Sequence, residues 1–105
     1  RVLAAVELLS REGAPPETVV NIQGDEPLLG PESIDAAVAE LGAECSIATL
    51  VAPLDDPAKF RDPNAVKVVL ADDETALYFS RAPIPFPRGA GAGAPPPQAL
   101  LHIGL

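Results

Sequence analysis

One stretch near the N-terminus organises the rest of the chain: Thr18-Val19-Val20-Asn21-Ile22-Gln23-Gly24-Asp25-Glu26-Pro27-Leu28-Leu29. Its apolar half is β-branched at Val19, Val20 and Ile22 and is bounded by turn-forming residues, which predicts a short, internal, parallel strand. In open α/β sheets, ligands bind beyond the carboxyl ends of the strands. Residues 23–26 follow this strand directly, so we expect these polar side chains to face a ligand.

Two residues in this turn, Gly24 and Pro27, affect the direction in which the carboxylates of Asp25 and Glu26 can point. Gly24 lets the backbone turn or approach a ligand closely, and Pro27 prevents a central strand from continuing. Asp25 can then face a metal ion, and Mg²⁺ suits it because that ion is usually held by one or two carboxylates together with substrate phosphates. Spacing alone leaves an equal alternative, in which Asp25 and Glu26 only cap the next helix.

Length and composition limit the chain to one domain at most. With 105 residues, of which 48% are hydrophobic, it can bury a modest core. The first residues carry apolar positions at helical spacing with no N-cap before them, and the last residues stop inside an apolar run. We therefore expect residues 1–105 to be the central part of a single larger domain, truncated at both ends.

Charge and cysteine content limit the classes of binding partner and the cellular compartment that we expect for the protein. The net charge is −8 and the Lys and Arg residues do not cluster, which argues against binding to nucleic acid or anionic membranes. Cys45 is the single cysteine and cannot form an internal disulfide, so we expect a buried thiol in a reducing compartment. The sequence shows no signal peptide and no bilayer-spanning run, and the expected location is the cytoplasm.

The order of the elements predicts an α/β fold. Residues 1–11 have the apolar spacing of an amphipathic helix. A second helix is expected to begin at Gly30-Pro31-Glu32, because proline suits the first helical position, and to end at Gly42. Residues 46–51 favour a second strand, which together with residues 19–22 would complete a right-handed βαβ unit.

The second half of the chain is expected to hold a helical turn around residues 58–60 and then a hairpin. Its two strands, over residues 66–70 and 76–79, are separated by a connection of hairpin length and should pair antiparallel. Beyond the hairpin we expect an irregular proline-stiffened segment, a low-complexity surface loop and a return into the core: residues 80–87, 89–97 and 100–105.

Four blocks of sequence, in this order, resemble the 3-deoxy-manno-octulosonate cytidylyltransferase (CMP-KDO synthetase) family. They are Val19-Val20-Asn21-Ile22-Gln23-Gly24-Asp25-Glu26-Pro27-Leu28, Asp62-Pro63-Asn64-Ala65-Val66-Lys67-Val68-Val69, Ala76-Leu77-Tyr78-Phe79-Ser80-Arg81-Ala82-Pro83-Ile84-Pro85 and His102-Ile103-Gly104-Leu105. The four together are far more specific than any one of them. The resemblance covers the chain except for the segment between Arg88 and Gln98, which varies in length in the family.

The resemblance implies a nucleotidyltransferase fold with three α/β/α layers, incomplete in this chain. An open, largely parallel sheet would bind CTP, and an antiparallel hairpin region would contribute to a homodimer. The implied reaction transfers CMP from CTP to 3-deoxy-D-manno-octulosonate (KDO), with release of pyrophosphate, for lipopolysaccharide biosynthesis. The family's catalytic, Mg²⁺-binding aspartate falls on Asp25, and its substrate-binding residues fall on Gln23, Arg81 and His102.

The chemistry of two of these residues is compatible with their implied roles. The planar guanidinium of Arg81 can bind the carboxylate of the sugar through two hydrogen bonds. Without the resemblance, Arg81 is typical of a surface or packing residue and His102 of a satisfied core histidine. With it, we favour a sugar-binding arginine, and for His102 a hydrogen-bonding role rather than that of a general base.

Two features depart from the family pattern. Leu101 stands where the family usually has a basic residue just before the histidine. The family's N-terminal loop that grips the triphosphate and its C-terminal second metal-binding aspartate have no counterpart in these residues, so we expect the chain alone to be inactive. Two other hypotheses stay open: a related sugar-nucleotide synthetase acting on sialic acid or an amino variant of KDO, and a non-catalytic interaction domain.

Overall fold

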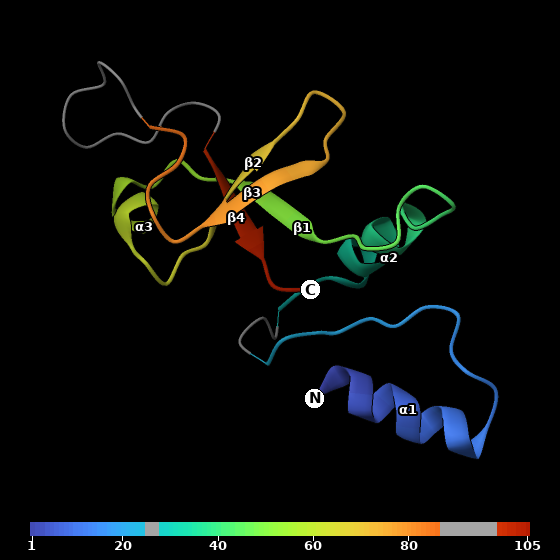
Figure 1. Ribbon diagram of the computed structural model, residues 1–105. Coiled ribbons are helices and arrows are strands. Elements are labelled where there is room, and N and C mark those ends of the chain that lie inside the picture. The colour runs from blue at the N-terminus through green and yellow to red at the C-terminus, as the bar shows by residue number, and fades with distance from the viewer. Residues whose placement is uncertain (25–27, 87–98) are drawn as a thin grey trace. The chain divides into compact units, whose positions relative to one another are not determined.

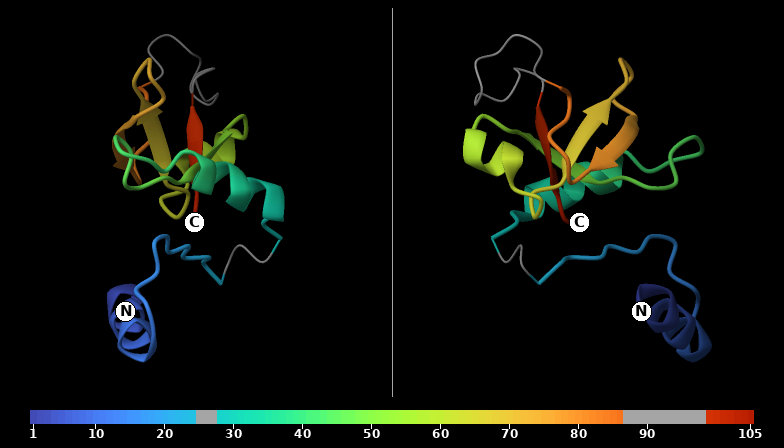
Figure 2. Two further views of the ribbon diagram at one scale, coloured as in Figure 1. Left: turned by 90° about the vertical axis from the view of Figure 1, so that its right-hand side faces the viewer. Right: turned by 60° about the vertical axis from the view of Figure 1, so that its left-hand side comes forward.

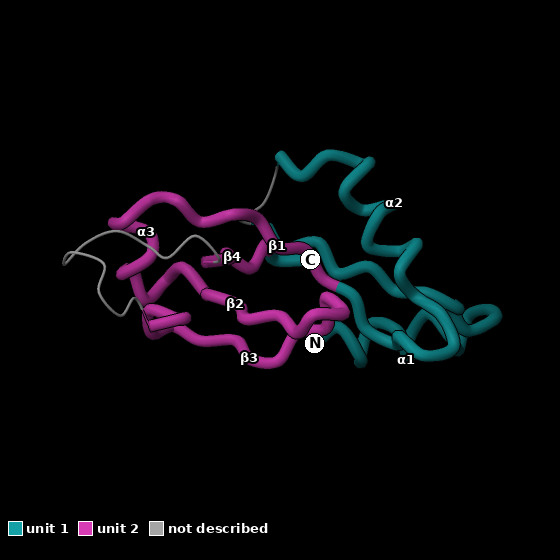
Figure 3. The backbone as a smooth tube through the Cα atoms, turned by 90° about the horizontal axis from the view of Figure 1, so that it is seen from above, with its two compact units in different colours: residues 1–48, 104–105 teal, residues 49–103 magenta. Residues whose placement is uncertain are grey.

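The computed structural model describes residues 1–24, 28–86 and 99–105. The chain forms two compact units, one of residues 1–48 with 104–105 and the other of residues 49–103 (Figure 3). The predicted roles of Asp25 and Glu26 and the low-complexity loop over residues 89–97 lie outside the described residues.

The second unit is built on one four-stranded sheet (Figure 1). Its strands are β1 (Leu50–Pro53), β2 (Lys67–Leu70), β3 (Ala76–Ser80) and β4 (Leu100–Ile103), in the spatial order β1-β4-β2-β3. Every neighbouring pair is antiparallel. The views in Figure 2 show β4, in red, lying between β1 and β2. The predicted return of residues 100–105 into the core is therefore confirmed, as an interior strand of the sheet.

The predicted hairpin is confirmed as β2 and β3, and its turn is closed by several hydrogen bonds. The Ala71 N–H donates to the Thr75 carbonyl at 2.9 Å. Asp73 Oδ1 accepts from both the N–H and the hydroxyl of Thr75, at 3.1 and 2.6 Å. These bonds stabilise the carboxylate and lower the pKa of Asp73. Glu74 has φ of 66°, the left-handed conformation that turns the chain back without a glycine.

A small apolar core lies beside the sheet in this unit. Leu54, Phe60 and Ala99 are buried together, and Leu101 packs against them. Phe60 comes from α3 (Pro57–Arg61), the helical turn that the sequence predicts. This helix begins where it does because Asp56 caps it: Asp56 Oδ1 accepts from the Ala58 and Lys59 N–H groups, at 2.8 and 3.4 Å.

The first unit contains α1 (Val2–Glu12) and α2 (Pro31–Ala39). As predicted, α2 begins with Pro31 at its first position. It ends at Ala39 rather than running on to Gly42, because the Leu41 N–H bonds back to the Val38 carbonyl at 3.1 Å and tightens the last turn. Cys45, expected to be buried, is a free, half-buried thiol.

The predicted βαβ unit is wrong for the described residues. Residues 19–22 form no strand, and Val19, Val20 and Ile22 are 47%, 40% and 53% exposed. The strand expected over residues 46–51 begins only at Leu50 and pairs antiparallel with β4. A strand exists only where a neighbouring strand accepts its hydrogen bonds, and the described residues offer none to 19–22. The mixed α/β composition holds, whereas the largely parallel sheet is replaced by an antiparallel one.

Candidate active site

Lys67 is the most deeply placed polar residue of the described chain. Its side chain is 0% exposed, and its ammonium donates to the carbonyls of Asp62 at 2.8 Å, of Arg81 at 2.9 Å, and of Ala65. An ammonium group has three donors, so all of them are used. Burial lowers the pKa of Lys67, an effect partly opposed by the nearby Asp62 carboxylate and reinforced by the Arg81 charge.

The turn over residues 62–65 supplies carbonyls to Lys67 and to Arg81. It is held by its own bonds, from the Asn64 N–H to Asp62 Oδ1 at 2.8 Å and from the Ala65 N–H to the Asp62 carbonyl at 3.2 Å. Its Pro63 carbonyl accepts from Arg81 Nη1 at 2.7 Å. The turn is therefore connected to Arg81 in two ways. The Arg81 guanidinium bonds to the turn directly, and the Lys67 ammonium bonds both to the turn and to the Arg81 carbonyl.

Arg81 follows β3 directly and is exposed. Ser80, the last residue of β3, accepts a hydrogen bond from the Ala82 N–H at its Oγ, at 3.0 Å, which turns the chain away from the sheet at this point. A guanidinium has five N–H donors in a fixed fork. Among the described residues, the Pro63 carbonyl accepts from one of these donors, and the others can donate to a carboxylate ligand.

His102 lies in β4 with its ring half-buried between two side chains. Its Nε2 is 2.9 Å from Thr49 Oγ1, and its ring meets the ring of Phe79 edge-on, with 5.3 Å between centroids. The His102 N–H donates to the Val66 carbonyl at 2.8 Å. The longer contact from Thr49 Oγ1 to the Ile103 carbonyl, 3.4 Å, makes the imidazole the stronger partner of this hydroxyl.

Gln23 belongs to the first unit, where its side chain packs against Gly104. A Cβ atom at Gly104 would lie 2.6 Å from the Gln23 amide carbon, so any side chain at position 104 would require the flexible end of Gln23 to move. Asp25 lies outside the described residues. The structure thus places His102 in β4 and Arg81 just after β3 of the same sheet, both in the second unit, and it describes Gln23 in the first.

Sequence reasoning did not select Lys67 and Thr49. Lys67 stands among β-branched residues in the run Val66-Lys67-Val68-Val69, and a single charged residue in such a run is a signal of a paired interior charge. No comparable signal marks Thr49, because its role depends on a partner 53 residues further along the chain.

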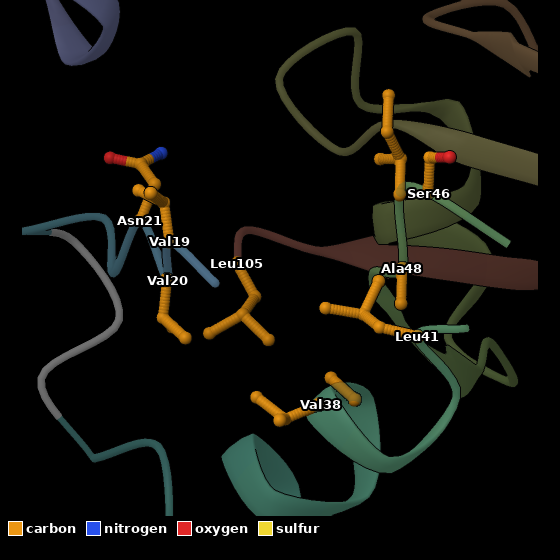
Figure 4. A pocket seen from close by; sticks show the side chains of 10 residues that line it. Val19, Val20, Asn21, Val38, Leu41, Ser46, Ala48 and Leu105 are labelled. Carbon is orange, nitrogen blue, oxygen red and sulfur yellow. The ribbon is translucent and has the colours of Figure 1, made fainter. Parts of the chain in front are cut away.

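The first unit holds a cavity of about 230 Å³ (Figure 4). Its lining comes from the 19–21 segment, from α2 and the residues after it, and from the C-terminal residue: Val19, Val20, Asn21, Ala37, Val38, Leu41, Ser46, Ile47, Ala48 and Leu105. The lining is largely apolar, and Asn21 and Ser46 are its polar side chains. Asp, Glu, His, Lys and Cys side chains are not among the lining residues, so the lining side chains supply no general acid or base.

A cluster of metal ligands and a membrane-spanning helix are both absent from the described part of the chain. Within residues 1–24, 28–86 and 99–105, no three His, Cys, Asp or Glu side chains gather closely enough to hold a metal ion. In the same part of the chain, every helix is too short or too polar to cross a lipid bilayer.

The chain belongs to the cytidylyltransferase family, which it matches over residues 1–99. Two relatives are 3-deoxy-manno-octulosonate cytidylyltransferases. That of Syntrophobacter fumaroxidans (strain DSM 10017 / MPOB) is 47% identical over 107 residues, covering 100% of this chain and 41% of that protein. That of Solibacter usitatus (strain Ellin6076) is 48% identical over 101 residues, covering 94% and 38%.

A solved structure, CMP:2-keto-3-deoxy-manno-octonic acid synthetase complexed with CTP, matches with a TM-score of 0.72 and 32% identity. The match covers 98% of this chain and 41% of the synthetase. It confirms the α/β class predicted from the sequence, with the sheet antiparallel in the described residues. This chain therefore spans about two-fifths of the length of the relatives it matches.

Proposed function

We propose that the intact protein, meaning the polypeptide as its organism makes it, transfers CMP from CTP to KDO and releases pyrophosphate, in lipopolysaccharide biosynthesis. The observation that carries the proposal is the match of 98% of this chain to a synthetase solved with CTP bound. The two relatives named as KDO cytidylyltransferases, each nearly half identical to this chain, support KDO as the acceptor.

The sugar acid would be bound from the second unit. The carboxylate of KDO is a planar anion, and the N–H donors of Arg81 left by the Pro63 contact can bind it through two parallel hydrogen bonds. His102 would hydrogen-bond a sugar hydroxyl, with Thr49 holding its ring in place through Nε2. Both residues would act by binding and orienting the acceptor sugar.

The nucleotide would be bound near the turn that follows residues 19–22, with Gln23 contacting it and Asp25 as a Mg²⁺ ligand. The donor set fits, because Asp25 offers a hard carboxylate oxygen and Mg²⁺ takes most of its other ligands from phosphates and water. Gly24 beside it has no described atom within 4 Å of a Cβ position, which leaves room for a ligand. When bound, Mg²⁺ would neutralise charge on the triphosphate.

We also propose a homodimer in the cytoplasm. The edge strand β3 exposes Leu77, Tyr78 and Phe79, at 66%, 60% and 44%, and an apolar edge of this kind is a surface that a second copy can cover.

The lone cysteine accords with a reducing compartment. Sedimentation of the intact protein and cell fractionation test these two points, and a monomer or a membrane-bound pool would contradict them.

The reaction is tested directly on the purified intact protein. Pyrophosphate release is followed with CTP, Mg²⁺ and KDO, and CMP-KDO is identified by mass spectrometry. Parallel assays replace KDO by sialic acid or by the amino variant of KDO. Release that requires KDO supports the proposal. Preference for another acceptor would move the protein to a related synthetase, and no release with any acceptor would favour a non-catalytic domain.

A further inference from the structure

Lys67 occupies the row of the sheet from which both candidate sugar-binding residues extend. In the strand register it lies opposite Ser80 on β3 and opposite Leu101 on β4. These two residues immediately precede Arg81 and His102 in the sequence. The position of Lys67 in β2, between β4 and β3 (Figure 1), therefore fixes where both side chains leave the sheet.

The Lys67 ammonium also holds the backbone of Arg81 itself. It donates to the Arg81 carbonyl at 2.9 Å while its other bonds go to the turn over residues 62–65. The guanidinium of Arg81 returns to the same turn, at the Pro63 carbonyl, at 2.7 Å. Arg81 is thus fixed at its backbone by Lys67 and at its side chain by the turn that Lys67 holds.

A buried ammonium is a costly way to fill space, because an apolar side chain of similar length would avoid the loss of hydration. What an apolar side chain cannot supply is a set of donors that joins three carbonyls from two segments in one arrangement. The presence of a lysine therefore indicates a requirement to hold these two segments in one arrangement. Of the residues that this ammonium holds, Arg81 presents an exposed cationic side chain.

We propose that Lys67 is a positioning residue, which holds Arg81 so that its guanidinium is already oriented for the carboxylate of the sugar acid before the substrate binds. The inference rests on the proposed function. Without Lys67, the Arg81 backbone and side chain would have to be ordered when the sugar binds, which weakens binding of that substrate alone. CTP, which the proposal assigns to the turn after residues 19–22, would bind as before.

The test compares Lys67→Met and Lys67→Gln with the wild type in the intact protein. Lys59→Met is the matched control, because Lys59 is the only other lysine of this chain and its side chain is exposed on α3. Steady-state pyrophosphate release gives separate KM values for KDO and CTP. We expect Lys67→Met to raise the KM for KDO by about tenfold and to change the KM for CTP by less than about twofold. The control should change neither.

A double-mutant cycle with Arg81→Lys separates positioning from general support of the fold. If Lys67 acts through Arg81, the double variant should raise the KM for KDO little more than Arg81→Lys does alone. Additive effects, equal changes in both KM values, or no change would overturn the proposal. If Lys67→Met is unfolded by circular dichroism, Lys67→Gln is the variant compared, since it keeps an N–H donor pair without a buried charge.

Two further results have a defined meaning. If neither Lys67 variant folds, Lys67 is required for folding alone and the positioning role is wrong. If the folded wild type does not release pyrophosphate with KDO, the proposed function itself fails. The wild-type assay alone shows this, so this failure is distinct from a failure of the positioning role of Lys67.

Discussion

Replacing Thr49 by valine tests whether the hydroxyl beside His102 supports the proposed sugar site. Valine keeps the branched shape and removes only the 2.9 Å hydrogen bond to Nε2 and the weaker contact to the Ile103 carbonyl. A hydrogen bond of this kind contributes about 1 kcal/mol net. Both partners are half-buried, so water cannot fully replace the lost partner. A loss of this size lowers the melting temperature of a typical domain of roughly 150–250 residues by about 2–4 °C, and we expect a fall of about this size in the intact protein.

The same hydrogen bond sets the expected change in substrate binding. If the His102 ring must be held in one orientation to bind the sugar, losing this hydrogen bond weakens KDO binding by about 1 kcal/mol. We therefore expect the KM for KDO to rise about fivefold and the KM for CTP to stay within about twofold. Differential scanning fluorimetry and steady-state pyrophosphate release on one preparation measure both quantities.

Thr75→Val is the matched control for this substitution. Its hydroxyl also makes a hydrogen bond, to Asp73 at 2.6 Å, but in the exposed turn of the hairpin. It should leave both KM values unchanged. A fall in melting temperature at Thr49→Val with an unchanged KM for KDO would show that Thr49 serves the fold only. An equal rise in both KM values would show that His102 does not belong to the sugar site.

Three further predictions concern single side chains. Asp25→Asn keeps the shape and any capping ability but removes the charge, so kcat should fall by about 10²-fold or more at near-normal stability. Activity preserved across a Mg²⁺ titration would leave Asp25 as a cap. Arg81→Lys should raise the KM for KDO and not that for CTP, since lysine lacks the fork; the reverse pattern in the same assay would assign Arg81 to the nucleotide. Because the pKa of Asp73 is lowered on folding, its stabilising effect is present above the unfolded value of 3.8 and is lost as the pH falls through the folded value. The stability difference between wild type and Asp73→Asn, followed by urea unfolding, should therefore shrink below pH 3.8, and a constant difference would contradict this assignment.

Local chemistry predicted some elements well. The hairpin of β2 and β3 was predictable because two strand-like apolar runs flank a short polar turn, and α2 because Pro31 marks its first position. α3 follows from the same kind of signal, an aspartate before a proline.

The remaining errors have a physical origin in partners that are distant in the sequence. Val19, Val20 and Ile22 have the composition of a buried strand, but composition does not provide the neighbour that a strand needs. The pairing of β1 with β4 depends on residues some fifty positions apart, and no local pattern shows it. The same holds for the site: the motif blocks contain Arg81 and His102, whereas the hydrogen bonds that hold them come from Lys67 and Thr49 across the sheet.

The interior place of β4 also sets an order in which this unit can fold. β4 is the last strand in the sequence, yet β1 and β2 both pair with it, and β1 has no other partner among the described strands. Joining β1 to β4 closes a loop roughly nine times longer than the hairpin, at an extra entropic cost of about 2 kcal/mol. The hairpin of β2 and β3 can therefore form early, while β1 waits for residues 100–103 to emerge from the ribosome. Until then the backbone N–H and C=O groups of β1 can pair with any other strand. In this interval the nascent chain is most prone to incorrect strand pairing.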